Sequence, residues 1–355
     1  MSTALASCAS AHPKSSPTPS RYPVSLIPTT ADAARYAAPG YSTSPASPAA
    51  SSATPIRVPI TGQPLWINRN LPAAVQVAAW RTQGNEADAA VLDRIASQPM
   101  AIWLTSDTPA TLTQLKQVTE TADAMRQLPT LVLYNMVDRD CSGFSSGGAA
   151  SDQAYKSWID AIVSALGDRR AIVILEPDAV ADVVAGCAAA HAAERFALLR
   201  YAVTALEQHL GISVYLDAGT PGFPSNMQAL VSALKQSGVD AAQGVSLNVS
   251  NFYTVASVTS YGDRLSSALG GAHFVIDTSR NGAGPLPPHS GYAGPAWCNP
   301  PGRKLGNPPT TTTGRAEIDA YLWIKTPGAS DGACGVGDPP AGKWWLTYAM
   351  ALATP

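Results

Sequence analysis

The stretch AIVILEPDAV (171–180) ends a short apolar run on two carboxylates that are separated by a proline. The run 171–175 is β-branched and free of polar side chains, which is typical of a strand buried on both faces of a parallel sheet. Because Pro177 continues neither a helix nor a strand ladder, Glu176 and Asp178 should lie just past this strand. Ligands of parallel α/β sheets and barrels bind at that edge. Taken alone, the motif is equally compatible with a strand end whose acids are only solvated.

The rest of the chain, from about Thr61, alternates short apolar runs with amphipathic segments. The expected strands are 101–105, 130–136, 171–177, 212–218, 244–250, 273–279 and 320–326. The expected helices are 110–127, 152–166, 192–210, 226–237 and 255–269, with a final helix from about Ala341. This order predicts βαβ units in one α/β domain with a mainly parallel sheet. The number of strands favours a closed or nearly closed (β/α) barrel, and a doubly wound open sheet is the alternative.

The first part of the chain has a different composition. Residues 1–60 are rich in Ser, Pro, Thr and Ala, so they cannot bury enough apolar surface to offset their ordering entropy. We therefore expect a disordered arm or linker over 1–60 and a folded domain over 61–355. The start MSTALASCASAH lacks a basic segment and a long apolar run, so no ordinary signal peptide is evident, and we expect that the start is truncated or misassigned.

Composition also limits the classes of partner. Charged residues make up 14% of the chain and the net charge is −2, so we expect no nucleic-acid partner. No uninterrupted apolar run is long enough to span a bilayer. The five cysteines are compatible with two disulfides and one remaining thiol in an oxidising compartment, and five free thiols in the cytosol are the alternative.

Aspartates follow several of the expected strands. They are Asp140, Asp178, Asp217, Asp277 and Asp331. One such residue usually caps a helix or forms a turn. In a parallel barrel, however, all these ends open on one face, where Arg139, Arg280 and Lys325 would join them. Since the histidines show no metal-ligand spacing, we predict acid/base chemistry at an acetal centre, with no metal and no cofactor.

Aromatic residues gather near the same strand ends and suggest a sugar ligand. They are Trp103, Tyr134, Phe223, Trp297 and Trp323. Burial in the core is the alternative for each of them, and it is the preferred interpretation for Trp323.

Two motifs carry a family resemblance. The segments LYNMVDRDCSG (133–143) and IVILEPDAV (172–180) resemble the signatures of glycoside hydrolase family 6, the inverting β-1,4-glucanases. Further blocks match in the same order: VYLDAG (214–219), SLNVSNFY (246–253), VIDTSRNG (275–282), WCNPPGRKLG (297–306) and YLWIKTPGASDGACG (321–335). The resemblance covers about Pro64 to the C-terminus and is strongest to actinobacterial endoglucanases. It implies a single distorted, incomplete parallel barrel of about seven strands.

The resemblance also implies catalytic roles. Asp178 matches the general acid that protonates the departing glycosidic oxygen, and Asp140 matches a helper carboxylate on the proton path of the water. A like charge beside an acid raises its pKa, so this pairing is physically sensible. Asp331 matches the residue proposed as the base, but beside Arg280 and Lys325 we expect it to act mainly through its charge.

Other positions match residues that hold the substrate or the water. Tyr134 corresponds to a residue that presses on the distorted sugar, and Ser146 to one that holds the nucleophilic water. The positions that match glucose-binding residues are Trp103, Asp217, Phe223, Asn251, Arg280, Trp297 and Lys325. Thr220 and Ala329 depart from the family pattern, which leaves a catalytically weak glucan-binding protein as one alternative and a cellobiohydrolase as another.

The family pattern of cysteine pairing implies disulfides Cys141–Cys187 and Cys298–Cys334, with Cys8 left over. Both bonds would brace loops at the strand ends. The expected protein is therefore a secreted endo-acting β-1,4-glucanase that binds cellulose-like chains and is a monomer.

Overall fold

The computed structural model describes residues 58–187 and 189–355. Residues 1–57, and with them Cys8 and nearly all of the expected arm, lie outside the described residues. The strands are β1 (Ile102–Leu104), β2 (Thr130–Leu133), β3 (Ala171–Leu175), β4 (Ile212–Asp217), β5 (Gly244–Leu247), β6 (His273–Asp277) and β7 (Ile318–Leu322). The α-helices are α1 (Pro72–Thr82), α2 (Glu86–Ala96), α3 (Pro109–Ala124), α4 (Asp152–Leu166), α5 (Ala179–Val184), α6 (Ala192–Glu207), α7 (Met227–Gln236), α8 (Val255–Ala268) and α9 (Leu346–Ala353). Three short 3-10 turns are η1 (Asp140–Ser142), η2 (Ala189–His191) and η3 (Val239–Ala241).

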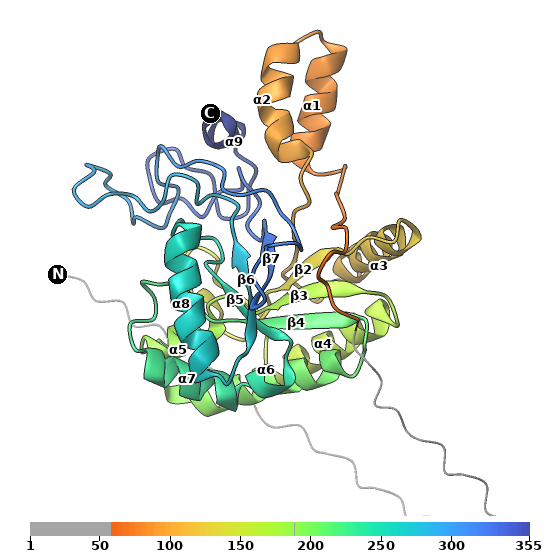
Figure 1. Ribbon diagram of the computed structural model, residues 1–355, viewed down its shortest axis with the longest axis vertical. Helices are drawn as coiled ribbons and strands as arrows, with labels where there is room; N and C mark the ends of the chain where they lie inside the picture. The colour runs from red at the N-terminus through yellow and green to blue at the C-terminus, as the bar shows by residue number, and fades with distance from the viewer. Residues whose placement is uncertain (1–57, 188) are drawn as a thin grey trace, which may run out of the picture. The chain divides into compact units, whose positions relative to one another are not determined.

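The strands form one sheet of seven in chain order, and every neighbouring pair is parallel. The strand direction turns between β4 and β6, so the sheet curls (Figure 1). Its two edges approach each other: the backbone N–H of Ala101, before β1, donates to the carbonyl of Trp323, after β7, over 3.0 Å. The predicted incomplete parallel barrel is confirmed, and the open doubly wound sheet is wrong.

Alternation along the strands divides the core into two layers. In β2, Leu131 and Leu133 join the large apolar cluster beneath the helices, whereas Val132 belongs to a second cluster on the inner face of the sheet. Strand β3 follows the same rule, with Val173 outside and Ile174 inside. Both faces are therefore buried, which explains why these strands are continuous apolar runs rather than alternating ones. Burying one such side chain contributes about 1.5–3 kcal/mol.

Five of the described α-helices begin at a side-chain cap. In each, the N-cap side chain accepts a hydrogen bond from a backbone N–H in the first turn: Asn85, Thr108, Ser151, Asn226 and Thr254. Such a cap contributes about 1 kcal/mol. The helices α3, α4, α6, α7 and α8 lie within the residues where helices were expected or within one residue of them.

Helices α1 and α2 were not expected from the sequence. They pack with α9 around a third apolar cluster that includes Val77, Leu92 and Trp323 (Figure 1). Because Trp323 is only 3% exposed, its interpretation as a core residue fits the structure. Helix α9 begins at Leu346, later than the expected start near Ala341.

Strand β7 was expected to run to residue 326 but ends at Leu322. The reason is that the backbone N–H groups of Ile324 and Lys325 donate to the carboxylate of Asp277, over 3.3 and 3.0 Å, instead of to a neighbouring strand. A strand-end carboxylate therefore ends the ladder and directs the following loop.

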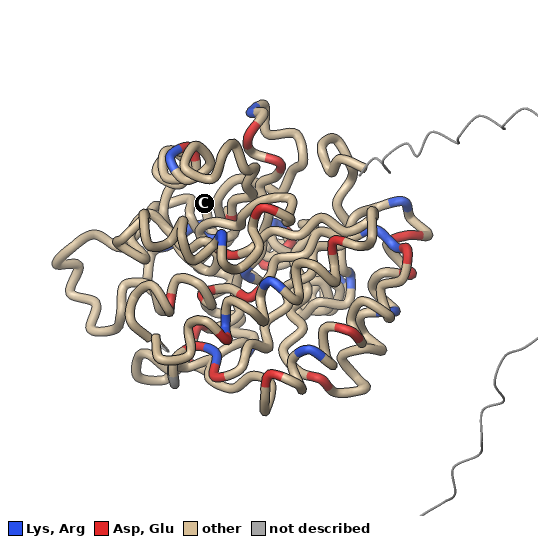
Figure 2. The backbone as a smooth tube through the Cα atoms, turned by 90° about the horizontal axis from the view of Figure 1, so that it is seen from below, with Lys and Arg blue, Asp and Glu red and all other residues tan. Residues whose placement is uncertain are grey.

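Acidic and basic residues are interspersed along the described chain, without a long stretch of one sign (Figure 2). Among the described residues, no helix combines the length and the apolar character that crossing a bilayer requires.

Candidate active site

The loop after β3 carries Asp178 in an unusual backbone conformation. Its φ of 69° is left-handed, as is that of Glu176 at 48°, and such conformations cost about 1–3 kcal/mol and concentrate at functional sites. Asp178 is the N-cap residue of α5, but its side chain makes no cap hydrogen bond. Its half-buried carboxyl group therefore remains available for other partners.

Burial raises the pKa of Asp178 well above its usual range, and the neighbouring carboxylates of Asp217, Asp182 and Asp140 add to this rise. The rise shifts Asp178 towards its protonated form, which is the state that a general acid needs.

Asp217 holds the Asp178 loop through hydrogen bonds. It is 2% exposed, and its carboxylate accepts hydrogen bonds from the N–H of Asp178, the N–H of Gly219 and the hydroxyl of Ser246, over 3.0, 3.2 and 3.3 Å. Burial raises its pKa to about 7 although these donors oppose the rise. The position that resembles a glucose-binding residue is thus fully engaged within the protein.

Asp140 lies in η1 after β2, on a loop held by several polar contacts. Its carboxylate accepts the backbone N–H of Ser145. Arg139 donates to the carbonyl oxygens of Thr105, Tyr134 and Ser145, over 2.9, 2.6 and 2.8 Å. Burial raises the pKa of Asp140, whereas the Ser145 N–H and the Arg139 guanidinium oppose the rise. Ser146 is exposed on the same loop.

A disulfide joins Cys141, next to Asp140, to Cys187, just after α5. It connects the loops of Asp140 and Asp178 covalently.

Tyr134 is buried beside both of these aspartates. Its pKa is raised by burial first and then by the charges of Asp178 and Asp140. The Arg139 guanidinium lies 4.8 Å from the centroid of the Tyr134 ring, and Trp103 meets that ring edge-on at 5.4 Å. The Nε1 of the half-buried Trp103 donates to the carbonyl of Ile324 over 2.8 Å.

Asp331 has the opposite electrostatic environment. Its carboxylate contacts Arg280 Nη1 at 2.8 Å and Lys325 Nζ at 2.9 Å, and it accepts the N–H of Asn299 over 3.0 Å. Burial opposes ionisation, but Arg280 and Lys325 prevail and lower the pKa of Asp331 to about 2. A carboxylate so firmly ionised is a weak base.

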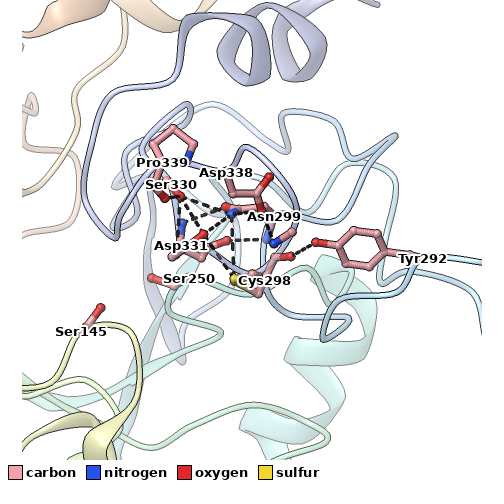
Figure 3. The surroundings of a disulfide bond; sticks show 12 residues. Ser145, Ser250, Tyr292, Cys298, Asn299, Ser330, Asp331, Asp338 and Pro339 are labelled. Atoms are coloured by element: carbon pink, nitrogen blue, oxygen red, sulfur yellow. Dashed lines mark hydrogen bonds between the residues drawn. A yellow bond between two sulfur atoms is a disulfide. The ribbon is translucent and has the colours of Figure 1, made fainter.

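The surroundings of Asp331 are braced by the second disulfide, Cys298–Cys334 (Figure 3). Asn299 spans the loops: its Nδ2 donates to the carbonyl of Gly332 over 2.8 Å, and its Oδ1 accepts the N–H of Asp331 over 2.8 Å. The hydroxyl of Tyr292 donates to the carbonyl of Cys298 over 2.6 Å.

The remaining expected sugar-binding residues lie on separate loops. Phe223 is 37% and Trp297 is 48% exposed, and Asn251 is half-buried with its Oδ1 accepting the N–H of Phe252 over 2.9 Å. Trp297 lies 6.3 Å, centroid to centroid, from Phe144, which is itself 47% exposed. Phe144 was not identified from the sequence, although an aromatic residue four positions after Asp140 was a usable signal.

Two strand-end acids are structural rather than available for chemistry. Glu176 is fully buried and accepts the backbone N–H groups of Asn135 and Met136 over 3.0 Å. Asp277, which had been grouped with the possible site residues, is fully buried and accepts the N–H groups of Ser250 and Lys325 among others. Both residues use their carboxyl oxygens as hydrogen-bond acceptors that join adjacent strand-end loops.

Within the described residues, one group of possible metal ligands lies close together: Cys141, Asp182 and Cys187. Both cysteines are joined in a disulfide, so they offer no thiolate to a metal ion.

This chain is similar in sequence to known proteins. The family model described as glycosyl hydrolases family 6 matches residues 60–355. Endoglucanase A of Cellulomonas fimi is 38% identical over 284 residues, which are 79% of this chain and 60% of that protein. Endoglucanase 1 of Streptomyces halstedii is 42% identical over 262 residues, 72% of this chain and 77% of that protein. The chain therefore spans less than two thirds of the Cellulomonas relative.

A solved structure matches this chain over nearly the whole length of the solved chain. The Cel6 endoglucanase of Mycobacterium tuberculosis, in complex with methyl-cellobiosyl-4-deoxy-4-thio-β-D-cellobioside, is 42% identical with a TM-score of 0.75. The match covers 83% of this chain and 97% of that one. The family match covers residues 60–355, and the strand order and the two disulfides that brace the loops are consistent with it. The chain therefore belongs to family 6 of the glycosyl hydrolases.

Proposed function

We propose that this chain hydrolyses internal β-1,4-glucosidic bonds of cellulose or related β-glucans with inversion at the anomeric carbon. The observation that carries the proposal is the contrast between two aspartates. The pKa of Asp178 is raised by burial and by nearby carboxylates, whereas cations lower the pKa of Asp331 to about 2. Pairs of carboxyl groups with such divergent environments are typical of acid catalysis beside a fixed negative charge.

In the proposed reaction, Asp178 gives its proton to the departing glycosidic oxygen. A water molecule attacks the anomeric carbon from the opposite face and loses its proton along a path that ends near Asp140 or Ser146. Tyr134, buried beside Asp178 and Asp140, presses on the distorted ring. Asp331 remains ionised and stabilises the positive charge that develops on the sugar.

The sugar-binding assignments belong to the same proposal. The residues are Trp103, Phe223, Asn251, Arg280, Trp297 and Lys325, and Asp217 contributes indirectly by holding the Asp178 loop. Arg280 and Lys325 act through Asp331, with which both pair. The exposed rings of Phe223 and Trp297 offer the apolar faces on which sugar C–H groups stack.

Endo action is supported by relatives that are named endoglucanases and are 36–42% identical. The relatives named as cellobiohydrolases are 31–34% identical. The two disulfides support secretion, since such bonds persist in oxidising compartments. We further propose that residues 61–355 form the catalytic domain and act as a monomer.

Anomeric analysis of the first products from cello-oligosaccharides tests enzyme, linkage and mechanism together. We expect the α-anomer to appear first. A burst of β-anomer would overturn inversion, and binding without cleavage would leave the glucan-binding alternative.

The variant Asp178→Ala should lose most activity on cellulose but much less on aryl glycosides, whose leaving groups need little protonation. Rapid loss of viscosity of a soluble cellulose derivative supports endo cleavage, whereas cellobiose release at constant viscosity supports the cellobiohydrolase alternative.

A further inference from the structure

Helix α5 carries a carboxylate, Asp182, to which the proposed reaction assigns no role. Asp182 follows Asp178 by four positions, and its backbone N–H donates to the carbonyl of Asp178 over 2.8 Å. Asp178 is the left-handed N-cap residue of α5, and the charge of Asp182 acts on it. Asp182 is half-buried, so its carboxylate is not an ordinary charge on a solvated helix face.

The same carboxylate approaches the loop of Asp140. An Asp182 oxygen and the two sulfur atoms of the Cys141–Cys187 disulfide lie within 4.8 Å of one another. Since Cys141 directly follows Asp140, Asp182 is next to both loops that carry the proposed acid and its helper.

A buried arginine completes this arrangement. Arg195 of α6 is 4% exposed, and its Nη2 donates to the carbonyls of Val137 and Asp138, over 3.1 Å each, just before Asp140. Its Nη1 is buried and has no hydrogen-bonding partner among the described residues. A buried guanidinium requires an opposite charge nearby, and Asp182 interacts electrostatically with it.

The charged groups around α5 can be named element by element. Asp140 of η1, Arg195 of α6 and Asp217 of β4 are the groups that act on Asp178 or Asp182. Tyr134, which follows β2, is sensitive to the charge of Asp178. Helix α7 also packs against α5, and its one titratable side chain is Lys235, exposed in the last turn.

We propose that Asp182 is a positioning residue that keeps Asp178 in its proton-carrying form and provides the counter-charge for the Arg195 brace of the Asp140 loop. The inference rests on the proposed function, in which Asp178 is the acid.

The effect of Asp182 should depend on pH. Burial raises the pKa of Asp182 to about 6, a rise that Arg195 opposes and Asp140 increases. Above pH 6 the ionised Asp182 disfavours ionisation of Asp178, which extends activity to higher pH. Below pH 6 Asp182 is neutral and contributes little. Loss of Asp182 also leaves the buried Arg195 cation without the carboxylate with which it interacts.

The test compares pH profiles of kcat/KM for the wild type and Asp182→Asn on a cello-oligosaccharide. We expect similar values of kcat/KM near pH 5. The basic limb should shift to lower pH by about half a pH unit to one pH unit, which is about a 3- to 10-fold loss of kcat/KM on that limb. The limb should not move for a dinitrophenyl cellobioside, whose leaving group needs no proton. The variant Asp182→Glu should restore the wild-type limb, and Asp182→Ser is a second neutral variant if Asp182→Asn does not fold.

The variant Glu194→Gln is the matched control, since it removes an exposed carboxylate next to Arg195. It should leave the profile unchanged. A loss in Asp182→Asn that is uniform over pH would show a merely structural role and overturn the proposal.

A second measurement does not depend on activity. The carboxyl group of Asp178 is titrated by ¹³C NMR in both proteins, with Asp178→Asn used for assignment. We expect a lower midpoint in Asp182→Asn, and an equal midpoint overturns the proposal. If the wild type cleaves no β-glucan, the proposed function fails, while this titration still decides the role of Asp182.

Discussion

The backbone N–H of Asp178 is held by the carboxylate of Asp217, with 3.0 Å between N and Oδ1. This contact fixes a residue whose left-handed φ of 69° is otherwise unfavourable. Asp217 thus acts on the proposed acid in two ways: it anchors the loop, and its charge raises the pKa of Asp178.

We therefore predict that Asp217→Asn, which keeps a hydrogen-bond acceptor but removes the charge, shifts the basic limb of the pH profile of kcat/KM to lower pH. Asp217→Ala also releases the loop and should reduce kcat about 10- to 100-fold, because a misplaced acid transfers its proton poorly. Steady-state kinetics on cello-oligosaccharides distinguish this role from direct sugar binding. A higher KM at constant kcat would favour the sugar-binding interpretation that the sequence suggested.

A second prediction concerns the ionised Asp331. Its pKa of about 2 lies below that of an unfolded aspartate, so its contribution to stability is complete above about pH 4 and is lost as the pH falls towards 2. The contribution amounts to roughly 2 kcal/mol. Asp331→Asn should lose about 3–5 kcal/mol near pH 7, because Arg280 and Lys325 are left without their counter-charge.

Denaturant unfolding of both proteins between pH 2 and pH 7 measures this difference. The gap between wild type and Asp331→Asn should narrow below pH 4, where the wild-type carboxylate takes up its proton. A gap that stays constant over this range would show that the penalty comes from packing and not from charge.

The fold was largely predictable because the strands are apolar on both faces and each ends in turn-forming or charged residues. Helices α1 and α2 were missed because PAAVQVAAWRT has only a weak amphipathic pattern, and the partner that buries it, α9, comes from the far end of the chain. The ends of β5 and β7 were also misjudged. Asn248 adopts a left-handed φ of 66° just after β5, and the amides after β7 bind Asp277. Neither feature can be read from local propensity.

The residue types of the candidate site were predictable, but the role of each aspartate was not. Asp178, Asp217, Asp277 and Asp331 all end strands or follow them, yet their roles depend on contacts made across the sheet. Asp277 faces four backbone amides and Asp331 faces two cations. Asp182 was not identified because an acid in the first turn of a helix is ordinarily a favourable interaction with the helix dipole.

A third prediction concerns the disulfide between Cys141 and Cys187, which closes a loop of 46 residue steps. Replacing both cysteines by alanine should lower the free energy of unfolding by about 3–4 kcal/mol in the chain-entropy model. Because the bond joins the loops of Asp140 and Asp178, kcat should fall as well.

The matched control replaces Cys298 and Cys334, which close a loop of 36 steps beside Asp331. It should lower the free energy of unfolding by a similar amount in the same model. The basic limb of the pH profile of kcat/KM should stay at the same pH. Equal kinetic defects in the two double variants would contradict a specific role for the first bond.

The last prediction concerns the contact between Gly332 and Phe144, which links the loop of Asp331 to the loop of Asp140. A Cβ atom at Gly332 would lie 2.4 Å from Cγ of Phe144, too close for any real pair of carbon atoms. Gly332→Ala should therefore displace Phe144 and the loop carrying Ser146, with a fall in both thermal stability and kcat/KM. The variant Gly337→Ala is the control, since Gly337 also has a positive φ, 85°, but open space around it.

A double-mutant cycle isolates the contact. Phe144→Ala removes the ring that blocks the new methyl group, so Gly332→Ala should cost clearly less in that background than in the wild type. If the penalty is the same in both backgrounds, the backbone conformation of Gly332 (φ 154°) and not Phe144 explains it.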